Sequence, residues 1–309
     1  MNKRVTGIIS VVLIVICLGY IIYDIATGKS EQVTVTETKE PEAILETNWI
    51  IDREFEVSYG ELNAVVVTQK NIIICAGNSF IASYDNYFNL LWSKSLDEPI
   101  FALAENKGII YAAAREEILL FDSQGELIEK WGPYDDNVLI TGLSANNEYV
   151  AIADAGNKLV FITDKYGALM SIIGYPGNQL IIPSAYFDVH LTDDNILLLA
   201  NTGKRSIEFR SIEGDIIKEI GQEGDELENF CGCCNPAHFD LLPDGNIVTA
   251  EKGINRLKII SSEGKLVEPI AQPAHFMASI PLDISAGTDG SVYGANRKDS
   301  KIYVFTRKN

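Results

Sequence analysis

The 309-residue sequence predicts an all-β domain, a six-bladed β-propeller, preceded by one N-terminal transmembrane helix. Three observations lead to this prediction. An uncharged apolar run lies near the N-terminus, a strand-and-turn pattern recurs after it, and one strand stands alone before the first copy. Because a single copy cannot bury its own strands, the copies have to pack against one another.

The predicted membrane anchor is the run 5–23, which follows Lys3 and Arg4 and contains no charged residue. At about 1.5 Å per residue, a helix of this length spans roughly 29 Å, which suffices for a bilayer core. The basic residues before the run predict a cytoplasmic N-terminus and an extracytoplasmic domain. A cleaved signal peptide is the alternative, since residues 26–28 offer a weak cleavage site.

The chain divides into three parts on composition. Residues 1–27 form the cytoplasmic stub and the anchor, 28–47 form an acidic linker rich in Thr and Glu, and 48–309 form the propeller. The net charge of -18 argues against nucleic-acid binding, because phosphate contacts need a basic surface. Five cysteines are too few for a disulfide-stapled scaffold.

Each copy of the repeat contains an apolar strand, a tight polar turn, a second and a third strand, and a turn with glycine that leads to a fourth strand. The turn glycines from Gly125 to Gly264 recur at roughly 40–50 residues, the spacing of four-stranded propeller blades. The copies begin near Val65 and at Ile100, Ile140, Phe187, Phe239 and Leu282.

The ends of the repeat array predict how the ring closes. The last copy stops after its third strand, and the segment 49–58 (WIIDREFEVS) precedes the first copy without a partner. We expect this N-terminal strand to complete the final blade, because such closure removes the open edges of the sheet.

The segments DGNIVTA (244–250) and SSEGKL (261–266), together with the strand-turn rhythm of 49–309, resemble the NHL-repeat class of six-bladed propellers. The resemblance implies the fold. It leaves the function open, because propellers carry many activities.

A cysteine box lies in the segment FCGCCNPAHF (230–239), which joins two blades. Such a crossover lies at the same end of a propeller as the loop between strands two and three. In the same blade this loop carries Glu251, Lys252 and Arg256. We therefore expect the box and the loop to be neighbours.

The pattern Gly232 to Pro236 followed by Glu251 to Gly253 looks like a bacterial subgroup of NHL-type proteins with Gly-Cys-Cys-Asn-Pro and Glu-Lys-Gly. This resemblance implies a bacterial relationship and no particular chemistry.

Four chemical interpretations of the box stay open. The cysteines can form a disulfide, either Cys233–Cys234 or one with Cys231, on the oxidising side of a membrane. Cys231, Cys233, Cys234 and His238 can hold a metal ion or an iron–sulfur cluster, although paired C-x-x-C spacings are absent. Lys252 and Arg256 can lower a thiol pKa and make it reactive. The box can also be inert packing, with His238 bonded to the backbone.

The loops between strands two and three carry basic residues on one face of an acidic protein. This favours a funnel that receives an anionic ligand or an acidic partner surface, with ordinary polar loops as the alternative. The basic residues are Arg115, Lys158, Lys204, Arg205, Lys252, Arg256, Arg297 and Lys298.

The sequence predicts a non-enzymatic protein-interaction or ligand-sensing module, attached to the cell membrane by a single pass, with another envelope protein or an envelope redox system as its partner. No nucleophile–base motif is legible. A thiol–disulfide or electron-transfer protein is the first alternative. The second is a metal-dependent hydrolase or lyase with scattered ligands in the funnel, for which the candidates are Asp154, Asn201, Glu251 and Asn296.

Overall fold

The computed structural model describes residues 12–20, 23, 46–174, 180–232, 235–254, 256–271 and 280–308. The chain forms two separate units, Met1–Ile44 and Leu45–Asn309. In the first unit, residues 12–20 and 23 are helical. No helix within the described ranges is both long enough and apolar enough to cross a bilayer. The predicted anchor 5–23 and linker 28–47 both extend over residues outside those ranges, so they stay predictions.

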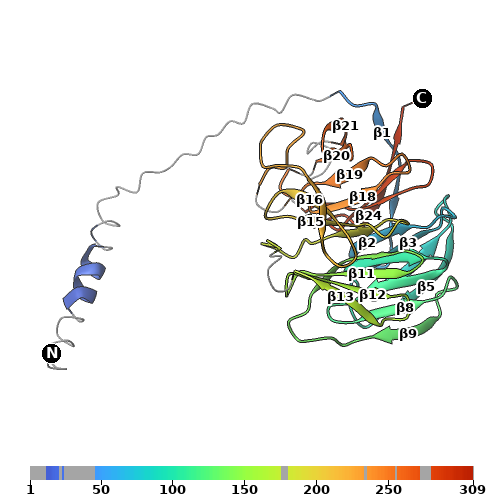
Figure 1. Ribbon diagram of the computed structural model, residues 1–309, viewed down its shortest axis with the longest axis horizontal. Helices are drawn as coiled ribbons and strands as arrows, with labels where there is room; N and C mark the ends of the chain where they lie inside the picture. Colours follow the sequence, from blue (N-terminus) through green and yellow to red (C-terminus); the bar gives the residue numbers. More distant parts are fainter. Residues whose placement is uncertain are drawn as a thin grey trace. The chain divides into compact units, whose positions relative to one another are not determined.

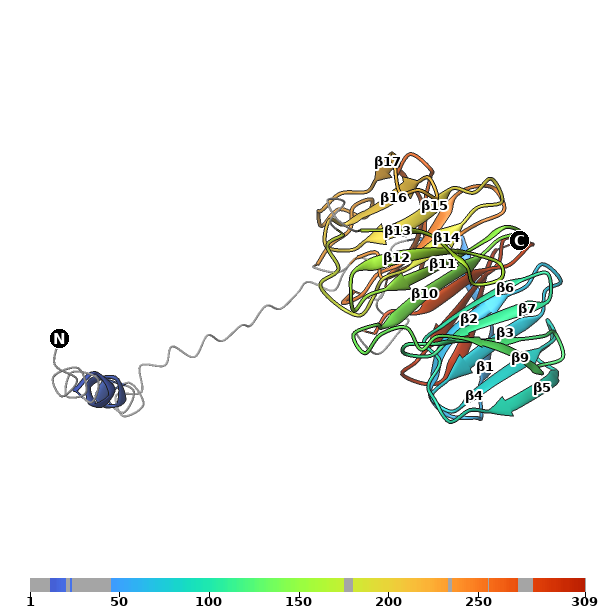
Figure 2. The same ribbon diagram turned by 60° about the horizontal axis from the view of Figure 1, so that its bottom comes forward.

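The second unit is a six-bladed β-propeller, as the repeat pattern predicted. Six four-stranded antiparallel sheets follow one another around a ring (Figures 1 and 2). The first three blades are β2 (Leu62–Val67), β3 (Ile73–Gly77), β4 (Phe80–Tyr84) and β5 (Leu90–Ser95); β6 (Ala102–Asn106), β7 (Ile109–Ala113), β8 (Ile118–Phe121) and β9 (Leu127–Trp131); and β10 (Ile140–Ala145), β11 (Tyr149–Asp154), β12 (Leu159–Asp164) and β13 (Leu169–Ile173).

The last three blades continue the same order from the innermost strand outward. They are β14 (Val189–Leu191), β15 (Leu197–Asn201), β16 (Ser206–Arg210) and β17 (Ile216–Ile220); β18 (His238–Leu241), β19 (Ile247–Ala250), β20 (Leu257–Ile260) and β21 (Leu266–Ala271); and β22 (Asp283–Ala286), β23 (Val292–Asn296) and β24 (Lys301–Arg307), completed by β1 (Trp49–Glu56).

The ring closes through the N-terminal strand, as predicted from the segment 49–58. Strand β1 pairs antiparallel with β24, so that Trp49 lies opposite Arg307 and Glu56 opposite Lys301. The Trp49 ring is buried and lies 5.4 Å from the Arg307 guanidinium. Because β1 occupies the outer position of the last blade, that blade gains the fourth strand that its own repeat lacks.

The hydrophobic core lies in layers between adjacent blades, and the turn glycines belong to this packing. Gly125 and Gly167 have φ angles of +80° and +85°, which suit glycine. A Cβ atom on either glycine would come within 3 Å of Trp92 or Trp131 from the preceding blade. At Gly214 and Gly264 the covering residues are Ile173 and Ile220, so the glycine period marks sites where an apolar side chain of one blade covers the turn of the next.

Candidate functional site

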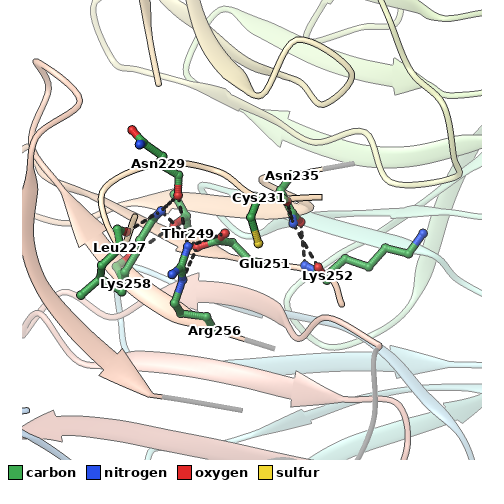
Figure 3. Close-up of polar contacts among 9 residues, drawn as sticks. All are labelled: Leu227, Asn229, Cys231, Asn235, Thr249, Glu251, Lys252, Arg256 and Lys258. Carbon is green, nitrogen blue, oxygen red and sulfur yellow. Dashed lines mark hydrogen bonds and ion pairs between the residues drawn. The ribbon is translucent and has the colours of Figure 1, made fainter. Parts of the chain in front are cut away.

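The cysteine box and the Glu-Lys-Gly loop are neighbours, as the repeat topology predicted (Figure 3). Asn235 joins them and is almost fully buried. Its Nδ2 donates to the carbonyl oxygens of Cys231 at 2.6 Å and Lys252 at 3.0 Å, and its Oδ1 accepts from the Lys252 amide at 2.6 Å. Cys233 and Cys234 lie outside the described residues.

A buried ion network of Glu251, Arg256 and Lys258, here called the Glu251 network, lies beneath the crossover that carries the box and holds it by hydrogen bonds. The Glu251 carboxylate accepts from Arg256 Nε at 2.8 Å and Nη2 at 2.9 Å, and Lys258 Nζ lies 3.1 Å from it. Lys258 Nζ also donates to the carbonyls of Leu227 at 3.0 Å and Asn229 at 2.6 Å. Two cations with one carboxylate thus satisfy backbone carbonyls of the crossover (Figure 3).

The environment of Lys258 is costly for a charge. Its side chain is fully buried, and burial lowers its pKa to about 8, although the Glu251 carboxylate acts in the opposite direction. Its ammonium also lies 4.3 Å from the centre of the Phe230 ring. Contacts with carbonyl groups, a carboxylate and an aromatic ring therefore replace the water that the Lys258 ammonium loses on burial.

Cys231 is a free, half-buried thiol. Burial raises its pKa, Glu251 raises it further, and the opposing effect of Arg256 is smaller. These effects do not support the hypothesis that Lys252 and Arg256 favour a thiolate at Cys231, which stays a prediction. Arg256 is engaged by Glu251, and Lys252 Nζ lies 4.9 Å from the Tyr186 ring centre. Figure 3 shows the Lys252 side chain extending away from the Cys231 sulfur.

The predicted metal or cluster ligands are only partly described. Across the described ranges, no group of three or more His, Cys, Asp or Glu side chains could hold a metal ion. His238 lies between two carboxylates of the neighbouring blades, with Nδ1 3.3 Å from Asp283 Oδ1 and 3.7 Å from Asp188 Oδ2. The ligand set with Cys233 and Cys234 stays a prediction, because these two residues lie outside the described ranges.

Asp188, His238 and Asp283 occupy the same level of three adjacent inner strands. His238 pairs with Ala250 and Asp283 with Ala295, at corresponding positions of their blades. The carboxylates bind the next inner strand: Asp188 Oδ2 accepts from the Phe239 amide at 3.0 Å. These aspartates thus join one blade to the next around the central channel.

The charged groups at the level of Asp188 shift the pKa values of His238 and Asp283. Burial raises the pKa of Asp283 to about 7. Burial alone would lower the pKa of His238, but the carboxylates of Asp188 and Asp283 outweigh it and raise that pKa. His238 Nδ1 is buried and makes no hydrogen bond of good geometry in this structure.

These channel aspartates were not predicted from the sequence, although a signal was present. Three clear copies of the repeat begin with an apolar residue followed by aspartate, at Asp188, Asp240 and Asp283. Asp188 and Asp283 occupy equivalent positions, and Asp240 lies two residues further along its own inner strand, so all three side chains lie on the same side of their strands.

The predicted basic face is largely neutralised around the box. Lys204 lies 2.9 Å from Glu208, Arg205 lies 3.1 Å from Glu223, and Arg297 pairs with Glu61. The box crossover itself exposes further carboxylates, which are Asp225, Glu226 and Glu228. The electrostatic support for an anionic ligand at this point is therefore weak.

The residues considered as scattered metal ligands instead hold the backbone. Asp154 Oδ1 accepts from the Leu139 amide at 2.9 Å, and Asn201 Oδ1 accepts from the Ile181 amide at 2.9 Å. Asn296 Oδ1 accepts from the Lys298 amide at 3.0 Å. These side chains fasten crossovers or loops, and Glu251 fastens the box crossover through its cations.

No protein-family model matches the chain, and neither does any curated protein by sequence. Among solved structures, a streptogramin B lyase is similar with a TM-score of 0.61 and 14% identity over 84% of this chain and 98% of its own. A virginiamycin B lyase from Staphylococcus aureus gives 0.59 and 13% over 82% and 98%. The WD40 β-propeller domain of Doa1 gives 0.57 and 14% over 79% and 78%. These likenesses show the propeller fold alone.

Proposed function

We propose that the chain is a protein-interaction module of a cell envelope that binds its partner through the box face. This face consists of the crossover 221–237 and the loop 251–256. The Glu251 network is the observation that carries the proposal, because it fixes an exposed crossover onto the rigid blade beneath it. A loop that is already ordered loses less conformational entropy when a partner binds.

The charge of the box face favours a basic partner surface. Asp225, Glu226 and Glu228 are exposed on the crossover, whereas Arg256 and Lys258 are buried and engaged beneath it. Exposed carboxylates of this kind steer association with a positively charged surface and set its salt dependence. The proposal therefore replaces the acidic partner expected from the sequence with a basic one.

Site-specific photo-crosslinking in native membranes tests the box face. A crosslinking residue at Glu226 should give one discrete adduct, whereas one at Glu129 on the outer strand β9 should not. Glu226→Lys combined with Glu228→Lys should abolish the adduct formed from a crosslinking residue at Asp225. Equal adducts from the Glu226 and Glu129 positions would show that the box face has no special role.

The proposal includes attachment to the membrane through residues 5–23, with the propeller extracytoplasmic. The uncharged run and its preceding Lys3 and Arg4 support this topology. A membrane-impermeant lysine reagent applied to intact cells should label the propeller. Recovery of the full-length chain in the soluble fraction, or labelling only after lysis, would contradict the anchored topology.

A thiol-redox role of the box is the second candidate, and the half-exposed free thiol of Cys231 favours it. Thiols of the purified full-length chain should be counted with and without reductant, together with metal analysis. Three unreactive thiols at the box and no bound metal would leave only the interaction role.

A further inference from the structure

The central channel contains a cavity of about 480 Å³ that lies away from the box face. The inner strands of all six blades line it. Its lining extends from Asp188, the last residue before β14, into the turns that follow the inner strands, with Gln69, Asp193 and Thr288, and it includes no residue of the box face. The cavity therefore opens at the end of the ring opposite the box crossover, and its volume suits a small molecule.

The two halves of the cavity differ in chemistry. Strands β2 and β6 contribute small apolar residues, among them Val67 and Ala104. Strands β14, β18 and β22 contribute carboxylates and one imidazole. The acidic residues of this half are Asp188, Asp193, Asp240 and Asp283, and the imidazole is His190; one further carboxylate, Glu105, lies near the end of β6.

The lining holds no lysine or arginine, and all of its residues belong to the described part of the chain. The cavity lining keeps a net negative charge in the combination of protonated histidines and aspartate considered next. Even with His190 and the neighbouring His238 both charged and Asp283 neutral, the remaining carboxylates outnumber the positive charges. A cavity with low-dielectric walls concentrates such a field.

His190 gives the acidic half a defined hydrogen-bonding group. Its Nδ1 lies 2.8 Å from Asp240 Oδ1, and Asp240 Oδ2 accepts from the Ala286 amide at 2.7 Å. This arrangement fixes the imidazole plane and keeps a proton on Nδ1. Nε2 has no partner in the described ranges, so a neutral ring presents it as an acceptor beside the carboxylate.

The aspartates also bind the backbone of neighbouring strands, and their carboxylates can still accept further hydrogen bonds. Each ionised carboxylate has about four lone-pair sites. Asp283 Oδ2 accepts from the Val65 amide at 2.7 Å, which orients the carboxylate without neutralising it. The backbone thus holds the carboxylates in place before a ligand arrives, which is the usual form of a preorganised site.

We propose that this cavity binds a small organic cation, an ammonium compound with a compact apolar body. The ammonium group would lie beside Asp188, Asp240 and His190, and the apolar body against the β2 and β6 wall. This inference is independent of the proposed partner binding, because the cavity and the box face lie at opposite ends of the ring.

Ligand-observed NMR with the full-length chain tests the proposal, with cyclohexylammonium as the probe and cyclohexanol as its neutral counterpart. The ammonium should bind saturably and at least about tenfold more tightly, which corresponds to about 1.4 kcal/mol. Equal binding of cyclohexanol would overturn the proposal. Competition by Mg²⁺ or Ca²⁺ at equal concentration would also overturn it, in favour of an inorganic cation.

Two variants locate the probe within the cavity. Asp240→Asn keeps an oxygen that can accept from the Ala286 amide and should weaken cyclohexylammonium binding about tenfold, about 1.4 kcal/mol. Asp193→Asn at the exposed mouth should weaken it about threefold and places little demand on folding. The control Asp97→Asn, exposed and outside the cavity, should have no effect. Unchanged binding in Asp193→Asn and in folded Asp240→Asn would refute the site.

Discussion

Blades four and five place opposite charges at the same buried position. Glu208 lies opposite Leu199 in blade four, and Lys258 lies opposite Thr249 in blade five, at equivalent points of the two sheets. Both side chains are fully buried. The same buried position therefore holds an acid in blade four and a base in blade five.

The partners of the two residues differ in their location. Glu208 accepts from Asn201 at 2.8 Å, Lys204 at 2.9 Å and Arg210 Nε at 2.7 Å, all within its own blade. Lys258 is a donor, and it reaches the carbonyls of the preceding crossover. The buried acid Glu208 binds side chains of its own blade, whereas the buried base Lys258 binds backbone carbonyls of the preceding crossover. This difference is why blade five supports the cysteine box.

The largest expected effect comes from Glu251→Ala. This change leaves two buried cations without a counter-ion and should lower the free energy of unfolding by about 3–5 kcal/mol. Urea unfolding of the full-length chain measures it. Glu129→Ala on the exposed outer strand is the control and should stay within about 0.5 kcal/mol of wild type. A loss similar to that of the control would show that the network contributes little.

The comparison predicts that only one of the two blades controls the crossover. Limited proteolysis should cut the crossover several-fold faster in Glu251→Gln. Glu208→Gln should destabilise blade four and leave the crossover as protected as in wild type. If protease cuts the crossover equally fast in both variants, the claim that only blade five holds the crossover is wrong.

Lys258 predicts a pH dependence of stability. Its folded-state pKa of about 8 lies below the ordinary value of 10.5, so the unfolded chain binds more protons between these two values. Stability of wild type relative to Lys258→Met should therefore rise with pH across this window, by about 3 kcal/mol in total. Urea unfolding at several pH values measures the difference. A flat difference would mean that Lys258 is not perturbed.

Asn235→Ala should have a smaller effect. It removes two hydrogen bonds between the box and the Lys252 backbone and one to Cys231 within the box, and it should cost about 1–3 kcal/mol. Thermal unfolding measures the loss, and hydrogen exchange should show faster exchange of the Lys252 amide. Asn86→Ala in an exposed turn is the matched control. Unchanged exchange at Lys252 would contradict the role of this side chain as a clamp.

The smallest effect concerns the Cys231 thiol. Its raised pKa should make alkylation by iodoacetamide at neutral pH slower than that of a free cysteine. Glu251→Gln removes one cause of the raised pKa and should speed the reaction. Mass spectrometry of the labelled chain follows both. Alkylation of wild-type Cys231 as fast as free cysteine would restore the reactive-thiol hypothesis.

Much of the fold was predictable because it follows from local signals that repeat. The turn glycines, the incomplete last copy and the solitary strand 49–58 together specified six blades and their closure. The proximity of the box to Glu251 followed from the same topology. These inferences needed only the order of the strands along the chain.

The chemistry of the site was less predictable because it depends on which groups are already engaged. Lys258 looks like an ordinary strand residue, and only its carbonyl partners, about thirty positions earlier, explain its burial. Arg256 seemed able to activate a cysteine until the structure placed Glu251 against it. The charged residues of the channel come from several blades that lie far apart in the sequence, so no single segment contains them.

The pairing of β1 with β24 ties the beginning of the propeller to its end, and this has a consequence for biosynthesis. Trp49 leaves the ribosome well before its partner Arg307 is made. At roughly 5–20 residues per second, β1 waits on the order of 10–50 s before the strand that receives it exists. During that time β1 has no partner strand, and a nascent chain cut short before β24 would leave β1 unpaired.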